Sequence, residues 1–270
     1  MQTVLTIAGF DPSSGAGVTA DLQVFAAHHL FGTSCITSLT VQSTLGVRAS
    51  HPVDGQIISE TLSCLDDDLP AAGIKIGMLG TIQAVTGVIT FLEILRDRGS
   101  NIPVVVDPVL RSSSGRELLE PGAADLLRTR LLPLADWVTP NLDELAWLVS
   151  ANVSQRDQLP EAARTLQEEV ARQCGRGINV LAKGGHLDTP DDLLLMADGT
   201  QHWLPGQRVE TTSTHGTGCA LSSALLSRLV LGDDPLAAAT HAKTYLTEAL
   251  RRATPIGHGR GPMNLLWPLL

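Results

Sequence analysis

The sequence predicts an α/β protein of three layers, in which helices cover both faces of a mostly parallel sheet. Short apolar runs bounded by glycine, proline or aspartate alternate with longer helical patterns along the chain, which is the order of a doubly wound sheet. These runs are apolar throughout, as expected for strands buried on both faces. Asp198-Gly199 separates two further short runs and indicates a hairpin, so we also expect a small antiparallel edge.

The predicted elements follow one another without a long linker, a low-complexity tract or an internal repeat. Parallel strands are expected at residues 4–8, 35–41, 73–76, 103–106, 137–138 and 178–182, and the hairpin strands at 192–196 and 201–204. Helices are expected at residues 16–29, 54–67, 82–98, 121–131, 142–150, 160–173, 218–231 and 235–253. We therefore predict one domain over residues 1–270.

Composition excludes several classes of protein. A chain of 270 residues with 43% hydrophobic content can bury a large core, and a net charge of -9 disfavours non-specific binding to nucleic acid or anionic membranes. The N-terminus lacks the pattern of a secretory signal, and no stretch approaches the roughly 18 apolar residues of a membrane span. The expected location is the cytoplasm. The four cysteines are far apart and form no CxxC pair, so neither a zinc site nor a disulfide framework is expected.

The most informative segment is Thr-His-Gly-Thr-Gly-Cys at residues 214–219, which runs into the helix expected at 218–231. Glycines allow close approach of the backbone, and the unpaired N–H groups of a helix N-terminus favour a phosphate. An anion-binding loop and a plain loop before a structural helix explain this segment equally well. Cys219 would lie in the first turn, where the pKa of a thiol is expected to fall.

Polar residues also follow the first three strands. The turn at residues 9–17 matches neither the dinucleotide fingerprint nor the P-loop, but Asp21 one turn into the next helix favours a ligand site over a tight corner. Gln42 offers a donor and an acceptor that suit the edge of a heterocycle, although a surface glutamine in a turn is the alternative. Met78 suits either the face of a flat ring or the core.

The later strands end in charged residues. Asp107 precedes the basic, serine-rich loop 111–116, which suggests a metal or phosphate contact under a mobile lid, or a helix cap with a solvated loop. Asn141 and Glu144 have the spacing of a capping box, and Glu144 also suits Mg²⁺ through water. Lys183 suits a nucleotide phosphate. Because the carboxyl ends of parallel strands share one edge of a sheet, these motifs predict a composite site for a small molecule and a phosphate donor.

Together the motifs resemble those of the bacterial hydroxymethylpyrimidine/phosphomethylpyrimidine kinases, which are ribokinase-like enzymes of thiamine biosynthesis. The matching segments cover nearly the whole chain in order: residues 8–17, 41–44, 75–79, 107–109, 139–141, 183–186 and 214–219. The resemblance implies a ribokinase-like fold without a separate lid domain, a homodimer, and transfer of the ATP γ-phosphoryl group to 4-amino-5-hydroxymethyl-2-methylpyrimidine and then to its monophosphate. Phe10 and Ser14 depart from the small residues common in the family, so a stiffer first turn and a slightly different pocket shape are expected.

The resemblance also implies residue roles. Substrate would be held by Gln42, Gly9, Asp21, Thr40, Met78 and Val109. ATP would be held by Lys183, Thr217, His215, Asn141 and Lys243. Mg²⁺ would lie by Asp107 and Glu144, and catalysis would involve Cys219 with Gly216 and Gly218.

Cys219 stands where sugar kinases of the wider superfamily carry an aspartate base. The first acceptor is an alcohol that benefits from a base, whereas the second is a phosphate already ionised at neutral pH. We hypothesise that a thiol tuned by the helix terminus accepts a proton in the first step and stays neutral beside the phosphate in the second. Cys219→Ala is then expected to damage the first phosphorylation much more than the second.

Three alternatives stay open. Pyridoxal kinase is the closest, because some relatives with the same cysteine loop phosphorylate pyridoxal, although Gln42 favours the aminopyrimidine. A sugar kinase is disfavoured by Cys219 and by the lack of an inserted lid domain. A catalytically silent ligand-binding protein of the same fold is disfavoured because Asp107, Lys183 and the segment 214–219 are all present.

Overall fold

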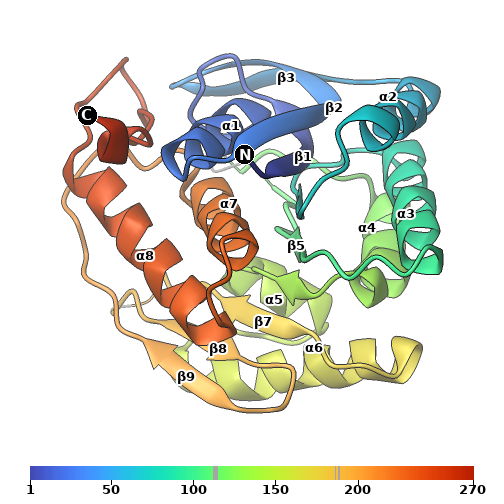
Figure 1. Cartoon of the computed structure of the whole chain (residues 1–270). Helices are drawn as coiled ribbons and strands as arrows, with labels where there is room; N and C mark the ends of the chain where they lie inside the picture. The colour runs from blue at the N-terminus through green and yellow to red at the C-terminus, as the bar shows by residue number, and fades with distance from the viewer. Residues whose placement is uncertain (112–114, 186, 188) are drawn as a thin grey trace.

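The computed structural model describes residues 1–111, 115–185, 187 and 189–270, and over these residues nine strands form one sheet (Figure 1). The strands are β1 (Thr3–Phe10), β2 (Phe31–Ser43), β3 (Gly46–Pro52), β4 (Ile74–Ile76), β5 (Val104–Val106), β6 (Trp137–Val138), β7 (Asn179–Ala182), β8 (Asp192–Leu195) and β9 (Gln201–Leu204). Their order is β3-β2-β1-β4-β5-β6-β7-β8-β9. In this spatial order, the six neighbouring strands β2, β1, β4, β5, β6 and β7 are parallel to one another. Strand β3 pairs antiparallel at one edge, and β8 and β9 pair antiparallel at the other.

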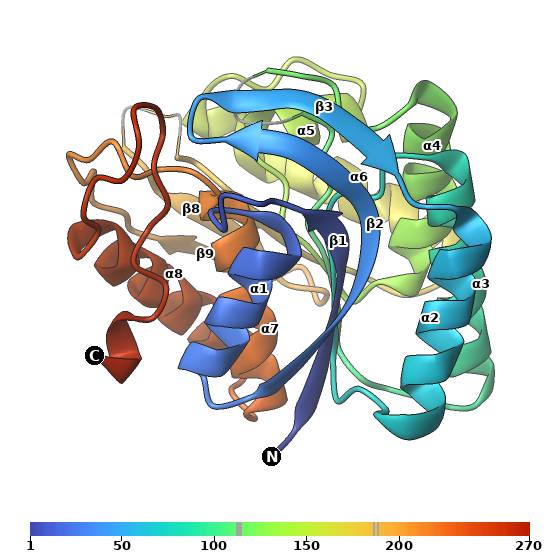
Figure 2. The same cartoon turned by 90° about the horizontal axis from the view of Figure 1, so that it is seen from above.

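Helices cover both faces of this sheet, which confirms the predicted fold class (Figure 2). One face carries α1 (Gly17–Ala27), α7 (Thr217–Val230) and α8 (Pro235–Arg251). The other carries α2 (Gly55–Asp68), α3 (Ile82–Asp97), α4 (Pro121–Leu126), α5 (Leu142–Leu148) and α6 (Leu159–Cys174). Strand β5 shows why the runs are apolar throughout: Val105 packs in the first of these cores, whereas Val104 and Val106 pack in the second.

The structure differs from the predicted elements at three places. Strand β3 was not predicted, so the sheet has an antiparallel strand at both edges rather than at one. Strand β2 begins at Phe31, four residues before the expected start at residue 35. The helix expected at 121–131 is α-helical only to Leu126 and continues as a π-helical turn over Leu127–Leu131, just before Pro133 interrupts regular helix hydrogen bonding.

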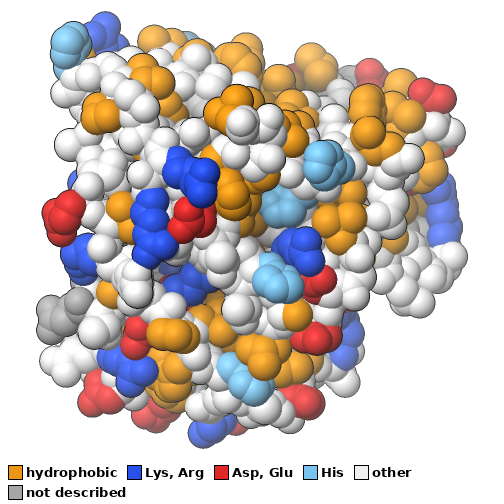
Figure 3. Space-filling model, turned by 60° about the vertical axis from the view of Figure 1, so that its left-hand side comes forward, with side chains coloured by type: hydrophobic (Ala, Val, Ile, Leu, Met, Phe, Trp, Pro, Cys, Tyr) orange, Lys and Arg blue, Asp and Glu red, His pale blue; other side chains and the backbone are white. Residues whose placement is uncertain are grey.

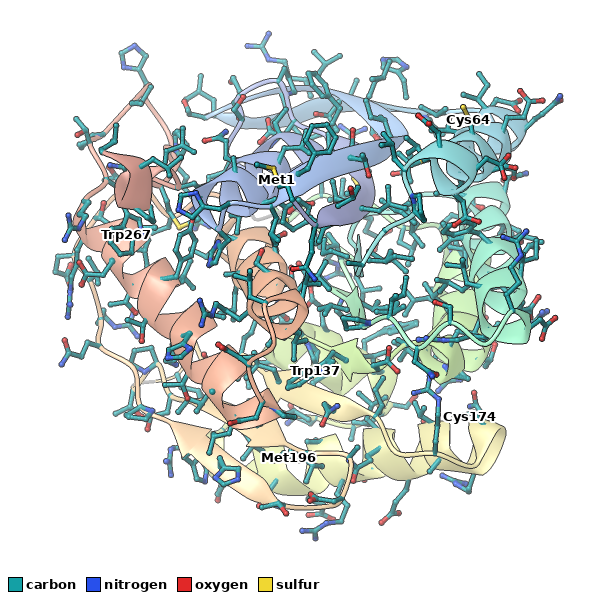
Figure 4. All side chains as sticks on the ribbon, in the orientation of Figure 1. Met1, Cys64, Trp137, Cys174, Met196 and Trp267 are labelled. Atoms are coloured by element: carbon teal, nitrogen blue, oxygen red, sulfur yellow. The ribbon has the colours of Figure 1, made fainter. Side chains whose placement is uncertain are left out.

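All four cysteines are free thiols. Figure 4 shows Cys64 on α2 and Cys174 at the end of α6, on separate helices. Lysine and arginine side chains are interspersed with acidic ones on the face shown in Figure 3, which therefore carries no large basic patch. Within the described ranges, none of the helices is both long and apolar enough to cross a membrane.

Candidate functional site

The residues that follow β5, β6 and β7 meet the N-terminus of α7 at one edge of the sheet. Lys183 Nζ lies 2.7 Å from Asp107 Oδ1 and 3.7 Å from Glu144 Oε2. A methyl group added to Gly218 would lie 3.1 Å from Lys183 Nζ and 3.5 Å from Asp107 Oδ2. The structure thus brings four of the predicted site residues into direct proximity, and it leaves little room for a side chain at position 218.

Glu144 combines the two roles that the sequence left open. Its side chain accepts from Asn141 N at 2.7 Å, and Asn141 Oδ1 accepts from Glu144 N at 2.9 Å, so the predicted capping box is formed. Burial of the carboxyl group, together with the nearby charge of Asp107, raises the pKa of Glu144 to about 7, although Lys183 opposes the shift. A partly protonated carboxyl group at this edge would ionise readily beside a cation.

Asp107 and Glu144 fit a magnesium ion held mainly by other ligands. Asp107 Oδ1 accepts from Lys183 and from Thr139 Oγ1 at 3.3 Å. Oδ2 faces Gly218, which belongs to the predicted phosphate loop, the segment 214–219. No cluster of three or more metal-ligating side chains occurs in the described part of the chain. Two carboxylates completed by substrate phosphates and water are typical of Mg²⁺ in kinases.

The predicted phosphate loop packs on the glycine-rich turn that follows β1. Gly216 precedes α7 with φ of 77°, and a Cβ there would lie 1.8 Å from Gly15 O. Only glycine meets both requirements. Thr217 begins α7, a helix of 14 residues whose unpaired N–H groups face the edge that holds Lys183.

The prediction that the helix terminus lowers the pKa of Cys219 is wrong. Burial of the thiol raises its pKa to about 11, and the charges of Asp107 and Asp21 act in the same direction. Lys75 and a hydrogen bond from the Gly17 backbone oppose the rise without reversing it. A helix terminus lowers the pKa of a thiol only where desolvation does not outweigh it, so Cys219 is a neutral thiol at neutral pH.

His215 points away from the expected ATP site and toward the turn after β1. Its Nε2 lies 2.7 Å from Asp11 Oδ2 and 2.9 Å from Gln42 Nε2. Thr40 Oγ1 lies 3.2 Å from Gln42 Oε1 and donates to Phe10 O at 2.9 Å. Asp11 was not among the predicted site residues, although an aspartate at the end of a strand was the signal used for Asp107.

Three further residues expected at the substrate lie at neighbouring strand ends. A Cβ added to Gly9, in β1, would meet Met78 Sδ at 3.0 Å, so Met78 packs directly on the Gly9 backbone. Met78 is held by Thr37, which donates to its carbonyl oxygen at 2.6 Å. Val109 is half-buried and donates from its backbone N to Asp107 O at 2.8 Å. Met78 and Val109 thus follow the neighbouring strands β4 and β5.

Asp21, expected at the substrate, lies in the interior of the protein. Its side chain is fully buried, and its carboxylate accepts from Lys75 Nζ at 2.8 Å, Thr6 Oγ1 at 2.6 Å and Ser223 Oγ at 2.7 Å. Lys75, also fully buried, was missed. A lysine inside the apolar strand Ile74–Ile76 is the signal that would have found it, because an ammonium group enters a core only with a partner.

Lys243 supports the loop after β7 rather than facing the phosphate loop. Its Nζ donates to Asp192 Oδ2 at 2.7 Å and to Pro190 O at 2.8 Å. Asp192 Oδ1 in turn accepts from Gly184 N at 2.8 Å, next to Lys183. Residues 112–114 of the lid expected at 111–116, and His186 of the matching motif, lie outside the described residues.

Comparison with known proteins places this geometry in a family. The family model described as phosphomethylpyrimidine kinase matches residues 11–264. The chain belongs to the phosphomethylpyrimidine kinase family. It is therefore a phosphotransferase, as predicted.

Two relatives and two solved structures illustrate the similarity. The hydroxymethylpyrimidine/phosphomethylpyrimidine kinase of Haemophilus influenzae is 38% identical over 269 residues, which cover 98% of this chain and 96% of the relative. A thiamine biosynthesis bifunctional protein of Geobacter sulfurreducens is 39% identical over 97% of this chain, which spans only 52% of that relative.

The phosphomethylpyrimidine kinase structure from Clostridium difficile has a TM-score of 0.77 and 33% identity, covering 92% of this chain and 99% of that one. The pyridoxal kinase of Staphylococcus aureus in complex with pyridoxal has a TM-score of 0.84 and 27% identity, covering 98% and 94%. Phosphomethylpyrimidine kinase and pyridoxal kinase thus share this fold, whereas the sequence of this chain is more similar to those of the pyrimidine kinases.

Proposed function

We propose that this protein transfers the γ-phosphoryl group of ATP to 4-amino-5-hydroxymethyl-2-methylpyrimidine and then to the resulting monophosphate. The observation that carries the proposal is the meeting of Lys183, Asp107 and Glu144 with Gly218 at the N-terminus of α7. The names of the relatives support the choice of substrate. Binding of ATP analogues by the pyridoxal kinase of the same fold supports the choice of donor.

The chain's own residues act mainly by positioning and by charge. Lys183 and the unpaired N–H groups of α7 stabilise the negative charge of the transferred group, which passes through a loose transition state. Asp107 and Glu144 would hold Mg²⁺, which neutralises phosphate charge when it is bound. Met78 and Val109 would pack against the ring, and Gln42 would hydrogen-bond its edge.

Cys219 serves this reaction as a small neutral group. The neutral thiol leaves room for the second acceptor, a phosphate, whereas an aspartate there would repel it. Because the loose transition state needs little help from a base, Cys219→Ser is expected to keep both steps within about tenfold of the wild-type rate. Cys219→Asp is expected to slow the second step by about a hundredfold more than the first.

Separate rate measurements with the alcohol and with the monophosphate check this expectation. Cys219→Ala distinguishes the neutral-group role from the base role inferred from the sequence. Loss of the first step alone in Cys219→Ala would restore the base hypothesis, and equal losses in Cys219→Asp would refute the repulsion argument.

The function itself is tested by incubating the protein with ATP and Mg²⁺ and either hydroxymethylpyrimidine or pyridoxal. We expect a pyrimidine product with two phosphates and a lower kcat/KM for pyridoxal. Exclusive phosphorylation of pyridoxal would instead favour the second candidate function, to which the structural similarity to pyridoxal kinases points. The single domain, the cytoplasmic location and the homodimer stay predictions from the sequence.

A further inference from the structure

The side chain of His215 fixes the hydrogen-bonding pattern around Gln42. Asp11 Oδ2, 2.7 Å from His215 Nε2, belongs to a carboxylate that also accepts from Ser13 and Ala16. Burial of Asp11 opposes its ionisation, but the hydrogen bonds from His215 and Ser13 hold its pKa below the ordinary value. An ionised carboxylate only accepts, so His215 Nε2 must carry the proton that it shares with Asp11.

That proton decides which way the Gln42 amide points. The structure places Gln42 Nε2 2.9 Å from His215 Nε2 and Gln42 Oε1 3.2 Å from Thr40 Oγ1. A protonated Nε2 cannot accept from the amide NH₂ group, so we assign the amide with its oxygen and nitrogen exchanged, which brings the carbonyl oxygen to the proton that His215 shares with Asp11. The amide NH₂ group then faces Thr40 Oγ1. The single proton of the Thr40 hydroxyl goes to Phe10 O, the shorter of its two contacts at 2.9 Å, so Thr40 Oγ1 is able to accept. All four groups are satisfied by this orientation, and the opposite one would place a donor against a donor.

The fixed amide has consequences for a ligand. Among the described partners, one amide N–H and one lone pair of the Gln42 carbonyl oxygen stay available. A 4-aminopyrimidine offers the complement, an exocyclic amine beside a ring nitrogen, and amide side chains pair in this way with adenine. The corresponding edge of pyridoxal carries a formyl oxygen, which only accepts, and a hydroxyl group in place of an amine, so it offers at most one donor.

We propose that His215, held by Asp11, is a positioning residue that orients the Gln42 amide and thereby sets the preference for an aminopyrimidine over pyridoxal. This inference rests on the proposed function, because it takes Gln42 to contact the ring. His215 also directly precedes Gly216, and its ring packs on Gly15, where a Cβ would lie 2.3 Å from His215 Cδ2. The same side chain therefore ties the ring-binding residue to the phosphate loop.

The test compares the binding of hydroxymethylpyrimidine and pyridoxal by calorimetry and their kcat/KM values. His215→Phe keeps a flat ring on Gly15 but removes the donor to Gln42, so the pyrimidine-to-pyridoxal ratio of affinities is expected to fall about tenfold. Asp11→Asn is expected to act in the same direction, because an asparagine donor lets His215 Nε2 accept and the Gln42 amide invert. The matched control is His51→Asn, because His51 is an exposed histidine on β3. This variant should leave the pyrimidine-to-pyridoxal ratio of affinities unchanged.

A milder variant covers the case in which these two proteins do not fold. Thr40→Val removes only the acceptor of the amide NH₂ group and is expected to lower the ratio about threefold. Equal loss of affinity for both rings, or an unchanged ratio in Thr40→Val and in the folded His215 and Asp11 variants, would overturn the inference. A wild-type protein that binds neither ring would instead refute the proposed function, so the two failures are distinguishable.

Discussion

His28 is a half-buried histidine whose protonation opposes folding. Its Nδ1 donates to Val24 O at 2.8 Å, and its ring lies against Tyr245 with centroids 4.7 Å apart. Burial lowers the pKa of His28 from 6.5, with Arg228 and His29 acting in the same direction and the bond to Val24 opposing them. The unfolded chain therefore binds this proton more readily, and the stability that neutral His28 contributes is present above about pH 6.5 and lost as the pH falls below it.

This sign predicts the behaviour of a His28→Gln variant. Its free energy of unfolding should depend less steeply on pH between 7 and 5 than that of the wild type, even though the lost contact with Tyr245 lowers its stability at pH 8. Urea unfolding at several pH values measures both effects, with His51→Asn as the control because His51 is exposed and is not among the groups that shift the pKa of His28. A slope identical to that of the wild type would mean that His28 has no share in the acid sensitivity.

The buried pair Lys75–Asp21 joins two central strands to two helices that cover one face of the sheet. Lys75 lies in β4 and Asp21 in α1, and the carboxylate also receives hydrogen bonds from Thr6 in β1 and Ser223 in α7. Lys75→Met would leave a buried carboxylate without a counter-charge and should lower the free energy of unfolding by about 3–5 kcal/mol. The double variant Lys75→Met with Asp21→Asn removes both charges and should recover most of that loss.

Chemical denaturation of the two single variants and the double variant measures the coupling between the charges. A double variant as unstable as the sum of the singles would show that packing, and not charge, accounts for the loss. Recovery would show that the pair is not needed for stability as such. The Lys75–Asp21 pair lies close enough to Cys219, in the first turn of α7, for its charges to act on the thiol. That proximity would then be the reason to look for a role of the pair in the site.

The elements that the sequence predicted best are those with a strong local pattern. The central strands and most helices follow from apolar runs bounded by glycine and proline. Strand β3 escaped because Gly46–Pro52 is a half-exposed edge strand with few apolar residues and a proline at its end, so neither alternation nor β-branched content marks it. Pairing with β2 creates this strand, and pairing is a tertiary effect.

The candidate site was also predicted only in part from the sequence. The rule that parallel strands end at one edge was sufficient to group Asp107, Glu144 and Lys183. The individual side-chain partners were not accessible in this way, because His215 is 173 positions from Gln42 and 204 from Asp11. The prediction of a lowered Cys219 pKa was wrong for a related reason. The local position at a helix terminus indicates a lower pKa, whereas burial, which depends on the whole fold, raises it.

The four thiols provide a probe of the whole molecule, because they lie at three levels of exposure and on separate elements. Cys64 and Cys174 are exposed, Cys219 is partly exposed beside the phosphate loop, and Cys35 is buried in the core. Burial raises the pKa of Cys35 to about 12 and that of Cys219 to about 11. Because only the thiolate reacts, alkylation at pH 8 should label Cys64 and Cys174 first, Cys219 more slowly, and Cys35 only on unfolding.

A non-hydrolysable ATP analogue with Mg²⁺ should add a ligand effect to this order. If the phosphates bind at residues 216–219, the analogue should slow labelling of Cys219 by about tenfold at saturation, while Cys64 on α2 keeps its rate as an internal control. Mass spectrometry of peptides after timed alkylation separates the four sites. Protection of Cys219 and Cys64 alike would indicate a general tightening of the fold, and no protection at Cys219 would place the nucleotide phosphates elsewhere.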